Sequence, residues 1–187
     1  MKLYPRFYII FALIVLGSCT SPNSQTKSLT ATTTTQIPQQ VVTLDKNFKI
    51  AMGQTIYVPI YSHIYHNDER KILDLAATLS IRNTDLNNPM IITSVRYYDS
   101  DGKLIKNYLD QPIQINALGS TDFFVNRTDS SGGSGANFIV EWVSPKIISE
   151  PIVEAVMIAT EFQQGVSFVS PGKVIKNLRK SQVTSAK

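Results

Sequence analysis

From residue 54 onward, hydrophobic residues recur at every second position in short runs that end at turn-forming residues. In one such run, Ala77, Leu79 and Ile81 alternate with polar neighbours. A period of two places the apolar side chains on one face of a β-strand, whereas a helix needs them three or four positions apart. No helical pattern persists for three turns, so we expect an all-β domain with at most one short helix, over 172–179.

Nine segments fit the strand pattern, and turn-forming residues separate them. The predicted strands lie near 54–65, 73–83, 90–99, 103–109, 112–116, 120–127, 137–144, 152–162 and 166–170. Strands of this length and spacing are typical of sandwich folds. We therefore predict a single immunoglobulin-like β-sandwich of about nine strands over 45–175. A domain of this size can form a core without disulfides or a metal, and we expect no cofactor.

Two local features support the sandwich. Asp99-Ser100-Asp101-Gly102 has an aspartate at its start and a glycine where a positive φ is needed, which predicts a type I hairpin turn with a G1 bulge. A calcium loop would need a third oxygen ligand before the glycine and a glutamate six residues after it, and neither is present. Trp142 alternates with Phe138 and Val140, so we expect it in the core.

The N-terminus predicts export. Lys2 and Arg6 form a positively charged start, and an unbroken apolar run of ten residues, 7–16, follows them. This run is too short to cross a hydrocarbon core of about 30 Å, and a charged start followed by such a run is typical of a signal peptide. We assign the signal peptide to residues 1–18.

The signal peptide ends in a lipidation motif. Leu16-Gly17-Ser18-Cys19 resembles the lipobox of bacterial lipoproteins, which implies cleavage after Ser18 and a lipid on Cys19. Cys19 is the only cysteine, so no intramolecular disulfide can form and its thiol is free for a thioether. Two or three acyl chains hold a protein stably at a membrane, where one holds it only marginally. The resemblance implies a bacterial envelope lipoprotein; the alternative is an ordinary signal peptide with an incidental cysteine.

Composition and charge define the two ends of the mature chain. Residues 20–40 are rich in Ser, Thr, Gln and Pro and contain no aromatic residue, so we expect 19–44 to form a disordered tether. The net charge of +4 is uneven: 45–173 carry 11 basic and 14 acidic residues, a net charge of −3, whereas 174–187 carry 4 basic and no acidic residues. Because the body has no basic cluster, we expect no nucleic-acid partner. We predict a basic disordered tail at 176–187.

Several ordered motifs in the body resemble a known family, the bacterial domain of unknown function DUF3124. They are Tyr57–Tyr65, Leu79–Asp85, Val95–Asp99, Gly132–Phe138 and Val153–Met157. The resemblance extends over roughly 54–175. It implies an envelope β-domain, and it brings no established activity.

The strand at 54–65 carries the strongest candidate binding residues. In an extended strand Tyr57, Tyr61, His63 and Tyr65 share one face, and Tyr97 or Tyr98 joins them if the strands pair appropriately. Tyrosine offers a broad apolar ring with a polar tip, which suits peptides and glycans, although sandwich cores use the same residues. His63 and His66 are weak metal candidates, because they fall on opposite faces unless the strand ends or bulges between them.

The glycine-rich segment 130–136 has three interpretations. A phosphate-binding loop needs a lysine and a following helix, and here a predicted strand follows. Gly132-x-Ser134-x-Ala136 approaches the nucleophile elbow of a hydrolase, but the sequence places no acid or base beside Ser134. We expect a flexible inter-strand loop, with a backbone recognition loop as the sharper alternative.

These observations favour a lipid-anchored, non-enzymatic β-domain that binds a protein, a peptide or a cell-wall component. The alternatives are a metal-binding or metal-handling lipoprotein that uses His63 and, less favoured, a hydrolase that uses Ser134. A His63-dependent metal affinity would distinguish the first alternative.

The lipobox generates a direct prediction. Replacing Cys19 with Ser should leave an unprocessed precursor and abolish incorporation of labelled fatty acid, because the hydroxyl cannot form the thioether. Metabolic labelling followed by gel electrophoresis measures both effects. Unchanged labelling of the variant would contradict the lipoprotein assignment.

Overall fold

The computed structural model describes residues 40–45, 47–161 and 164–179, and these residues form strands and one short 3-10 turn. The predicted signal peptide, Cys19, most of the tether and the end of the tail lie outside the described residues. The strands are β1 (Gln40–Val41), β2 (Met52–Pro59), β3 (His63–His66), β4 (Asp68–Asp74), β5 (Ala76–Arg82), β6 (Met90–Tyr98), β7 (Leu104–Asn107), β8 (Ile113–Ile115), β9 (Ser120–Val125), β10 (Asn137–Ser144), β11 (Ile152–Glu161), β12 (Gln164–Pro171) and β13 (Lys173–Arg179), with η1 (Gly133–Gly135) before β10.

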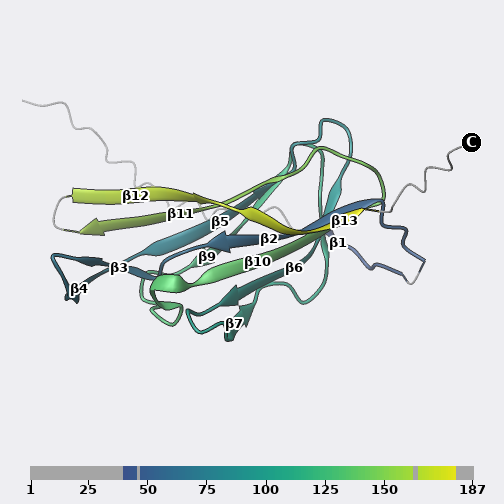
Figure 1. Ribbon diagram of the computed structural model, residues 1–187. Helices are drawn as coiled ribbons and strands as arrows, with labels where there is room; N and C mark the ends of the chain where they lie inside the picture. The colour runs from purple at the N-terminus through teal and green to yellow at the C-terminus, as the bar shows by residue number, and fades with distance from the viewer. Residues whose placement is uncertain (1–39, 46, 162–163, 180–187) are drawn as a thin grey trace, which may run out of the picture. The chain divides into compact units, whose positions relative to one another are not determined.

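Two antiparallel sheets face each other and a separate hairpin joins them (Figure 1). The larger sheet has the order β1-β8-β6-β10-β2-β13, with β7 paired to β6. The smaller sheet has the order β12-β11-β5-β9, and β3 pairs with β4 alone. The all-β prediction is confirmed. The structure has more strands than the nine predicted: the segment at 54–65 divides into β2 and β3, β4 lies mostly between the predicted segments 54–65 and 73–83, and each end of the domain adds one strand.

One hydrophobic core lies between the two sheets. Along β5, Ala77, Leu79 and Ile81 are buried while the residues between them are half-buried or exposed, as the period of two predicted. Trp142 is fully buried, and its indole N–H donates to the Gln54 side-chain oxygen at 3.3 Å. The core position predicted for Trp142 is confirmed.

The predicted hairpin turn is present between β6 and β7. The Gly102 N–H donates to the Asp99 carbonyl at 3.1 Å, and Gly102 has a φ of +79°. The Asp99 N–H donates to the Lys103 carbonyl at 3.0 Å, so the pairing closes around a bulged glycine. The Asp99 carboxylate accepts the N–H groups of Asp101 and Lys103, which assigns this aspartate to the turn.

The chain changes sheets between β12 and β13. β12 pairs with β11 in the smaller sheet, whereas β13 pairs with β2 in the larger one, and the Gly172 N–H between them donates to the Val153 carbonyl at 2.8 Å. The helix predicted over 172–179 is therefore wrong. A helix of this length is marginal in water, and the ladder offered by β2 outweighs it.

Both predicted ends of the folded domain were placed too far inward. Residues 176–179 belong to β13 rather than to the basic tail. At the other end β1 pairs with β8, and the Val42 N–H donates to the Pro112 carbonyl at 2.9 Å, so the tether does not extend to residue 44. The sequence pattern is weak at both ends, because the two residues of β1 are too few to show a period and β13 has a register shift between Val174 and Lys176. Within the described residues, no helix has the length and apolarity to span a bilayer.

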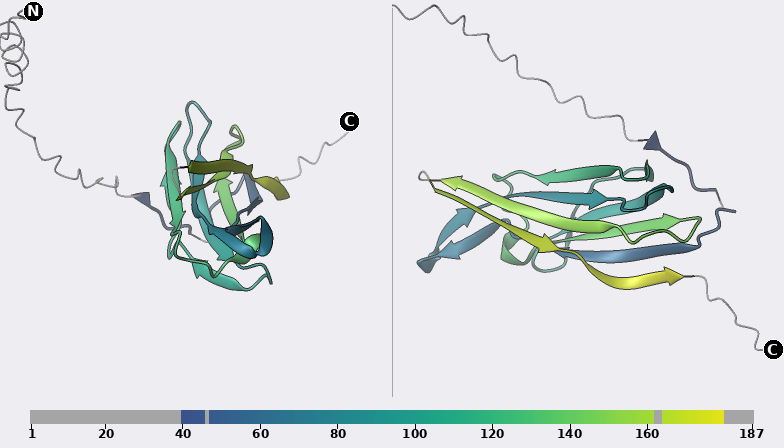
Figure 2. Two further views of the ribbon diagram at one scale, coloured as in Figure 1. Left: turned by 90° about the vertical axis from the view of Figure 1, so that its left-hand side faces the viewer. Right: turned by 90° about the horizontal axis from the view of Figure 1, so that it is seen from above.

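The β3–β4 hairpin, which we call the arm (63–74), lies at one end of the sandwich. The last residues of β11 and the first residues of β12 lie at the same end (Figure 1). β1 and the last residues of β13 lie at the opposite end, as the turned views also show (Figure 2). The described chain therefore enters and leaves the sandwich away from the arm.

Candidate functional site

The predicted strand 54–65 is broken before it reaches the arm. β2 ends at Pro59 and β3 begins at His63. Between them the Ile60 N–H donates to the Ala136 carbonyl at 2.9 Å and the Ser62 N–H to the Gly133 carbonyl at 3.0 Å. These bonds divert the segment from the large sheet to the glycine-rich loop, so the prediction of one continuous strand is wrong.

As a result, the four predicted binding residues occupy three places. Tyr57 is half-buried on the outer face of the large sheet, opposite Ile139. Tyr61 is exposed in the connecting segment, where its ring centroid lies 6.0 Å from that of Phe168 on β12. His63 and Tyr65 remain together on β3, with ring centroids 5.4 Å apart and planes at 81°. An edge-to-face contact of this kind fixes the two rings relative to each other.

The break between β2 and β3 is fixed by a buried pair of hydrogen-bonded hydroxyl groups, those of Ser62 and Tyr97, which we call the knot. The Ser62 Oγ and the Tyr97 hydroxyl lie 3.0 Å apart and share a hydrogen bond, and both residues are buried. Gly132 packs directly on this pair: a Cβ on Gly132 would lie 1.9 Å from the Tyr97 hydroxyl and 2.6 Å from the Ser62 Oγ. Any side chain at this position would displace the pair, so glycine is required by the close approach.

Ser100 holds the other side of the glycine-rich loop. Its N–H and its Oγ–H both donate to the Gly132 carbonyl at 3.0 Å, and its Oγ accepts the Gly135 N–H at 2.9 Å. The loop is therefore bonded on both sides, which corrects the expectation of a flexible loop. The Gly132, Gly133 and Ala136 carbonyls and the Gly135 N–H serve these internal bonds. η1 leads into β10 rather than into the helix that a phosphate loop or a nucleophile elbow requires.

The arm has one face on the core and one face free of it. Ile64 and Leu73 are paired across the two strands and pack against the core. The other face carries His63 opposite Asp74 and Tyr65 opposite Ile72. Tyr65 is 54% exposed and Ile72 is 49% exposed. An isolated hairpin is marginal in water, so the core contacts of the first face hold this exposed face in place.

His63 and Asp74 carry unpaired buried atoms on that face. The Nδ1 of His63 and the Oδ1 of Asp74 are both buried without a hydrogen-bond partner. The two residues are directly opposite each other in the β3–β4 register. A buried polar atom without a partner costs about 1–3 kcal/mol, so these two atoms mark a place suited to a bound group.

His66 is exposed and separated from this pair by a bulge. The register of β3 and β4 shifts between Tyr65 and His66, and Asn67 has a φ of 63°. This is the interruption that a shared metal site would require. Among the described residues, however, no group of three or more His, Cys, Asp or Glu side chains converges.

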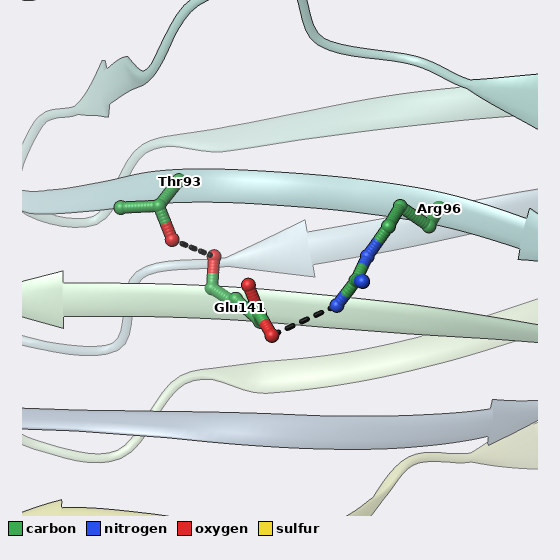
Figure 3. A network of polar contacts seen from close by, with 3 residues as sticks. All are labelled: Thr93, Arg96 and Glu141. Atoms are coloured by element: carbon green, nitrogen blue, oxygen red, sulfur yellow. Dashed lines mark hydrogen bonds and ion pairs between the residues drawn. The ribbon is translucent and has the colours of Figure 1, made fainter.

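The outer face of the large sheet holds a second polar arrangement. Tyr97 points into the core and Tyr98 outward, which decides which tyrosine can face a ligand. Beside Tyr98, Arg96 donates to Glu141 at 2.8 Å, and Figure 3 shows this ion pair with the bond from the Thr93 hydroxyl to the Glu141 carbonyl. The Arg96 guanidinium lies 6.0 Å from the centroid of the Tyr98 ring. Tyr57 faces the same side of this sheet, two strands away.

Sequence reasoning missed Asp74, Arg96 and Glu141. The only available signal was alternation: Arg96 and Glu141 occupy the outward positions of their predicted strands, and Asp74 lies near the start of a predicted strand. Which of these residues meet depends on the pairing of β6 with β10 and of β3 with β4, which a single sequence does not specify.

Comparison with known proteins finds one family model that matches this chain. The family model described as "Protein of unknown function (DUF3124)" matches residues 53–175. No curated protein and no solved structure matches the chain.

Burial also raises the pKa of two tyrosines, Tyr97 in the knot and Tyr108 near it. Burial raises the pKa of Tyr97, and the Ser62 hydrogen bond opposes that effect. Burial, with smaller contributions from Tyr97 and Asp129, raises the pKa of Tyr108 to about 12, and the Tyr108 hydroxyl donates to the Phe124 carbonyl at 2.9 Å.

These shifts predict a loss of stability at alkaline pH. An unfolded tyrosine loses its proton near pH 10, whereas folded Tyr108 keeps it to about pH 12. The stabilisation is therefore complete below about pH 10 and is lost as the pH rises toward 12. We expect the free energy of unfolding to fall over this interval, and to fall less steeply in Tyr108→Phe. Urea titrations at several pH values measure the free energy of unfolding. An identical dependence of this free energy on pH in both proteins would contradict the assignment.

Proposed function

We propose that this chain, which belongs to the DUF3124 family, is a lipid-anchored, non-enzymatic binding module of the bacterial envelope. Its lipid is on Cys19, and its domain faces the periplasm or the exterior. Its ligand is a protein, a peptide or a cell-wall component, and its binding surface is the exposed face of the arm with His63, Tyr65 and Ile72.

The observation that carries this proposal is the exposed pairing of Tyr65 with Ile72 on a hairpin fixed to the core. Tyrosine at an interface buries a large ring at a low cost in conformational entropy and still satisfies its hydroxyl. The edge-to-face contact with His63 holds the Tyr65 ring in one orientation, so the side chain loses little further conformational entropy on binding. β1 and the last residues of β13 lie at the end of the domain opposite the arm (Figure 2).

A second candidate function is metal handling through His63. The observation that favours it is the pair of unpaired buried atoms, His63 Nδ1 and Asp74 Oδ1, on facing strands. Imidazole and carboxylate together suit Zn²⁺ and Cu²⁺, with the remaining positions filled by water or by a partner.

Calorimetric titration of the full chain with Zn²⁺ tests the metal candidate. If metal handling is correct, His63→Ala and Asp74→Asn should each lower the affinity by at least tenfold, whereas His66→Ala, on the far side of the bulge, should leave it unchanged. Absence of binding, or binding that is insensitive to His63, would reject this candidate and leave the binding module untouched.

Site-specific photo-crosslinking in the native envelope tests the binding module. A photoreactive phenylalanine analogue at position 65 or 72 should give a specific adduct with one partner. The same analogue at Leu86, which is 71% exposed in the loop between β5 and β6, is the matched control and should give none. Truncation of an aromatic hot spot typically costs about 2 kcal/mol, so Tyr65→Ser should weaken binding to the identified partner about thirtyfold.

Two outcomes would overturn the proposal. The first is an absence of adducts at both arm positions while the arm remains folded. Ile72→Thr separates loss of the apolar contact from unfolding of the arm, because it removes apolar surface and keeps a β-branched residue. The second is an equal adduct at position 86, which would show that the analogue labels any exposed apolar site.

A further inference from the structure

Most edge strands of the described residues carry a protection against strand addition. β9, the second edge of the smaller sheet, carries the charged Asp122, and its Phe124 carbonyl accepts the Tyr108 hydroxyl. β13 carries Lys173 and Lys176 and a register shift between Val174 and Lys176, and β4 begins with four charged residues, 68–71. β1 and β7 are only two and four residues long. Lysines, bulges and short strands are the usual means by which proteins prevent edge pairing.

β12 has none of these protections. Its eight residues, 164–171, contain no charged side chain, and its only proline is the last residue. It pairs with β11 in an uninterrupted register from Glu154 opposite Pro171 to Glu161 opposite Gln164. No backbone hydrogen bond joins residues 165–170 to any described strand other than β11. The free edge is therefore a regular row of unpaired donors and acceptors.

The side chains of β12 make this edge apolar on both faces. Val166 is 40% exposed and Val169 is 55% exposed, and the two point to opposite sides of the sheet. On the outer face, Val169 is paired with Val156 of β11, and Ile158 on the same strand is 45% exposed. The apolar surface thus continues from the free edge across the neighbouring strand.

We propose that β12 is a homodimer interface, at which the β12 strands of two copies pair antiparallel about a two-fold axis and join the two smaller sheets into one. A two-fold interface brings the same strand against itself, so any charge on it would face its own copy nearby. β12 meets this requirement because it is uncharged, whereas self-pairing of β13 would bring lysines together. Pairing of two β12 strands completes the backbone hydrogen bonds of the edge and buries Val166 and Val169 of each copy.

A second copy is the occupant that the chemistry of the edge favours over a foreign strand. Recognition of a foreign strand gains its specificity from pockets or charges beside the edge. β12 itself carries no charge, and the outward neighbours of its central residues on β11 are the apolar Val156 and Ile158.

Sedimentation velocity of the full mature chain in density-matched detergent, over a range of concentrations, tests the interface. The unmodified chain should show a concentration-dependent dimer. Val169→Lys should abolish the dimer, because each copy would bring an ammonium group onto the paired edge, where the partner strand offers no opposite charge. Val169→Thr keeps a β-branched uncharged residue and should retain the dimer, and Ile152→Lys, which adds the same charge at a 49% exposed site on β11, should also retain it.

A disulfide trap locates the contact. Ser167→Cys, in the middle of β12, should form a linked dimer under mild oxidation, whereas Lys176→Cys on β13 should not. A monomer at all concentrations would overturn the proposal, as would a dimer that Val169→Lys leaves intact. A monomer whose Ser167→Cys variant becomes linked to a different protein would also overturn it and would assign the edge to a foreign strand.

Discussion

The hydrogen bond between Ser62 and Tyr97 is the contact on which the arrangement of the arm depends. It joins the segment after β2 to the end of β6, and Gly132 closes over it at a distance that no side chain permits. The same loop binds the backbone at Ile60 and Ser62 on one side and Ser100 on the other. The glycines of this loop are thus explained by close packing rather than by phosphate or substrate binding.

This knot also explains which parts of the molecule could be predicted from the sequence. The strands at 73–83, 90–99 and 137–144 were recognisable because alternate side chains are buried against the opposite sheet. The turn at Asp99–Gly102 was recognisable because its hydrogen bonds are local. The break after Pro59 was not, because it depends on the loop at 130–136, which is distant in sequence. The strip of four ring side chains predicted on one strand therefore became separate groups.

The strand at 173–179 shows the same limit from another direction. Its composition shows no clear period, and a register shift between Val174 and Lys176 disturbs the alternation that would have identified it. Its identity as a strand comes from β2, whose free side needed a partner. Protection then differs between neighbouring segments: β13 carries the lysines and the bulge of a protected edge, whereas β12, directly before it, carries neither. Such a contrast within one continuous stretch of chain becomes visible only when the two strands are assigned to different sheets.

Hydrogen exchange of the backbone amides in Gly132→Ala tests most directly the claim that the knot holds the arm. The added methyl group would displace the Tyr97 hydroxyl and the Ser62 Oγ. The backbone amides of the arm, 63–74, should therefore exchange at least about tenfold faster, whereas the amides that pair β5 with β11 should keep their protection. Gly165→Ala is the matched control, because its nearest neighbour would be a carbonyl oxygen at 3.9 Å. Unchanged protection of the arm in Gly132→Ala, or an equal loss throughout the sandwich, would contradict the account.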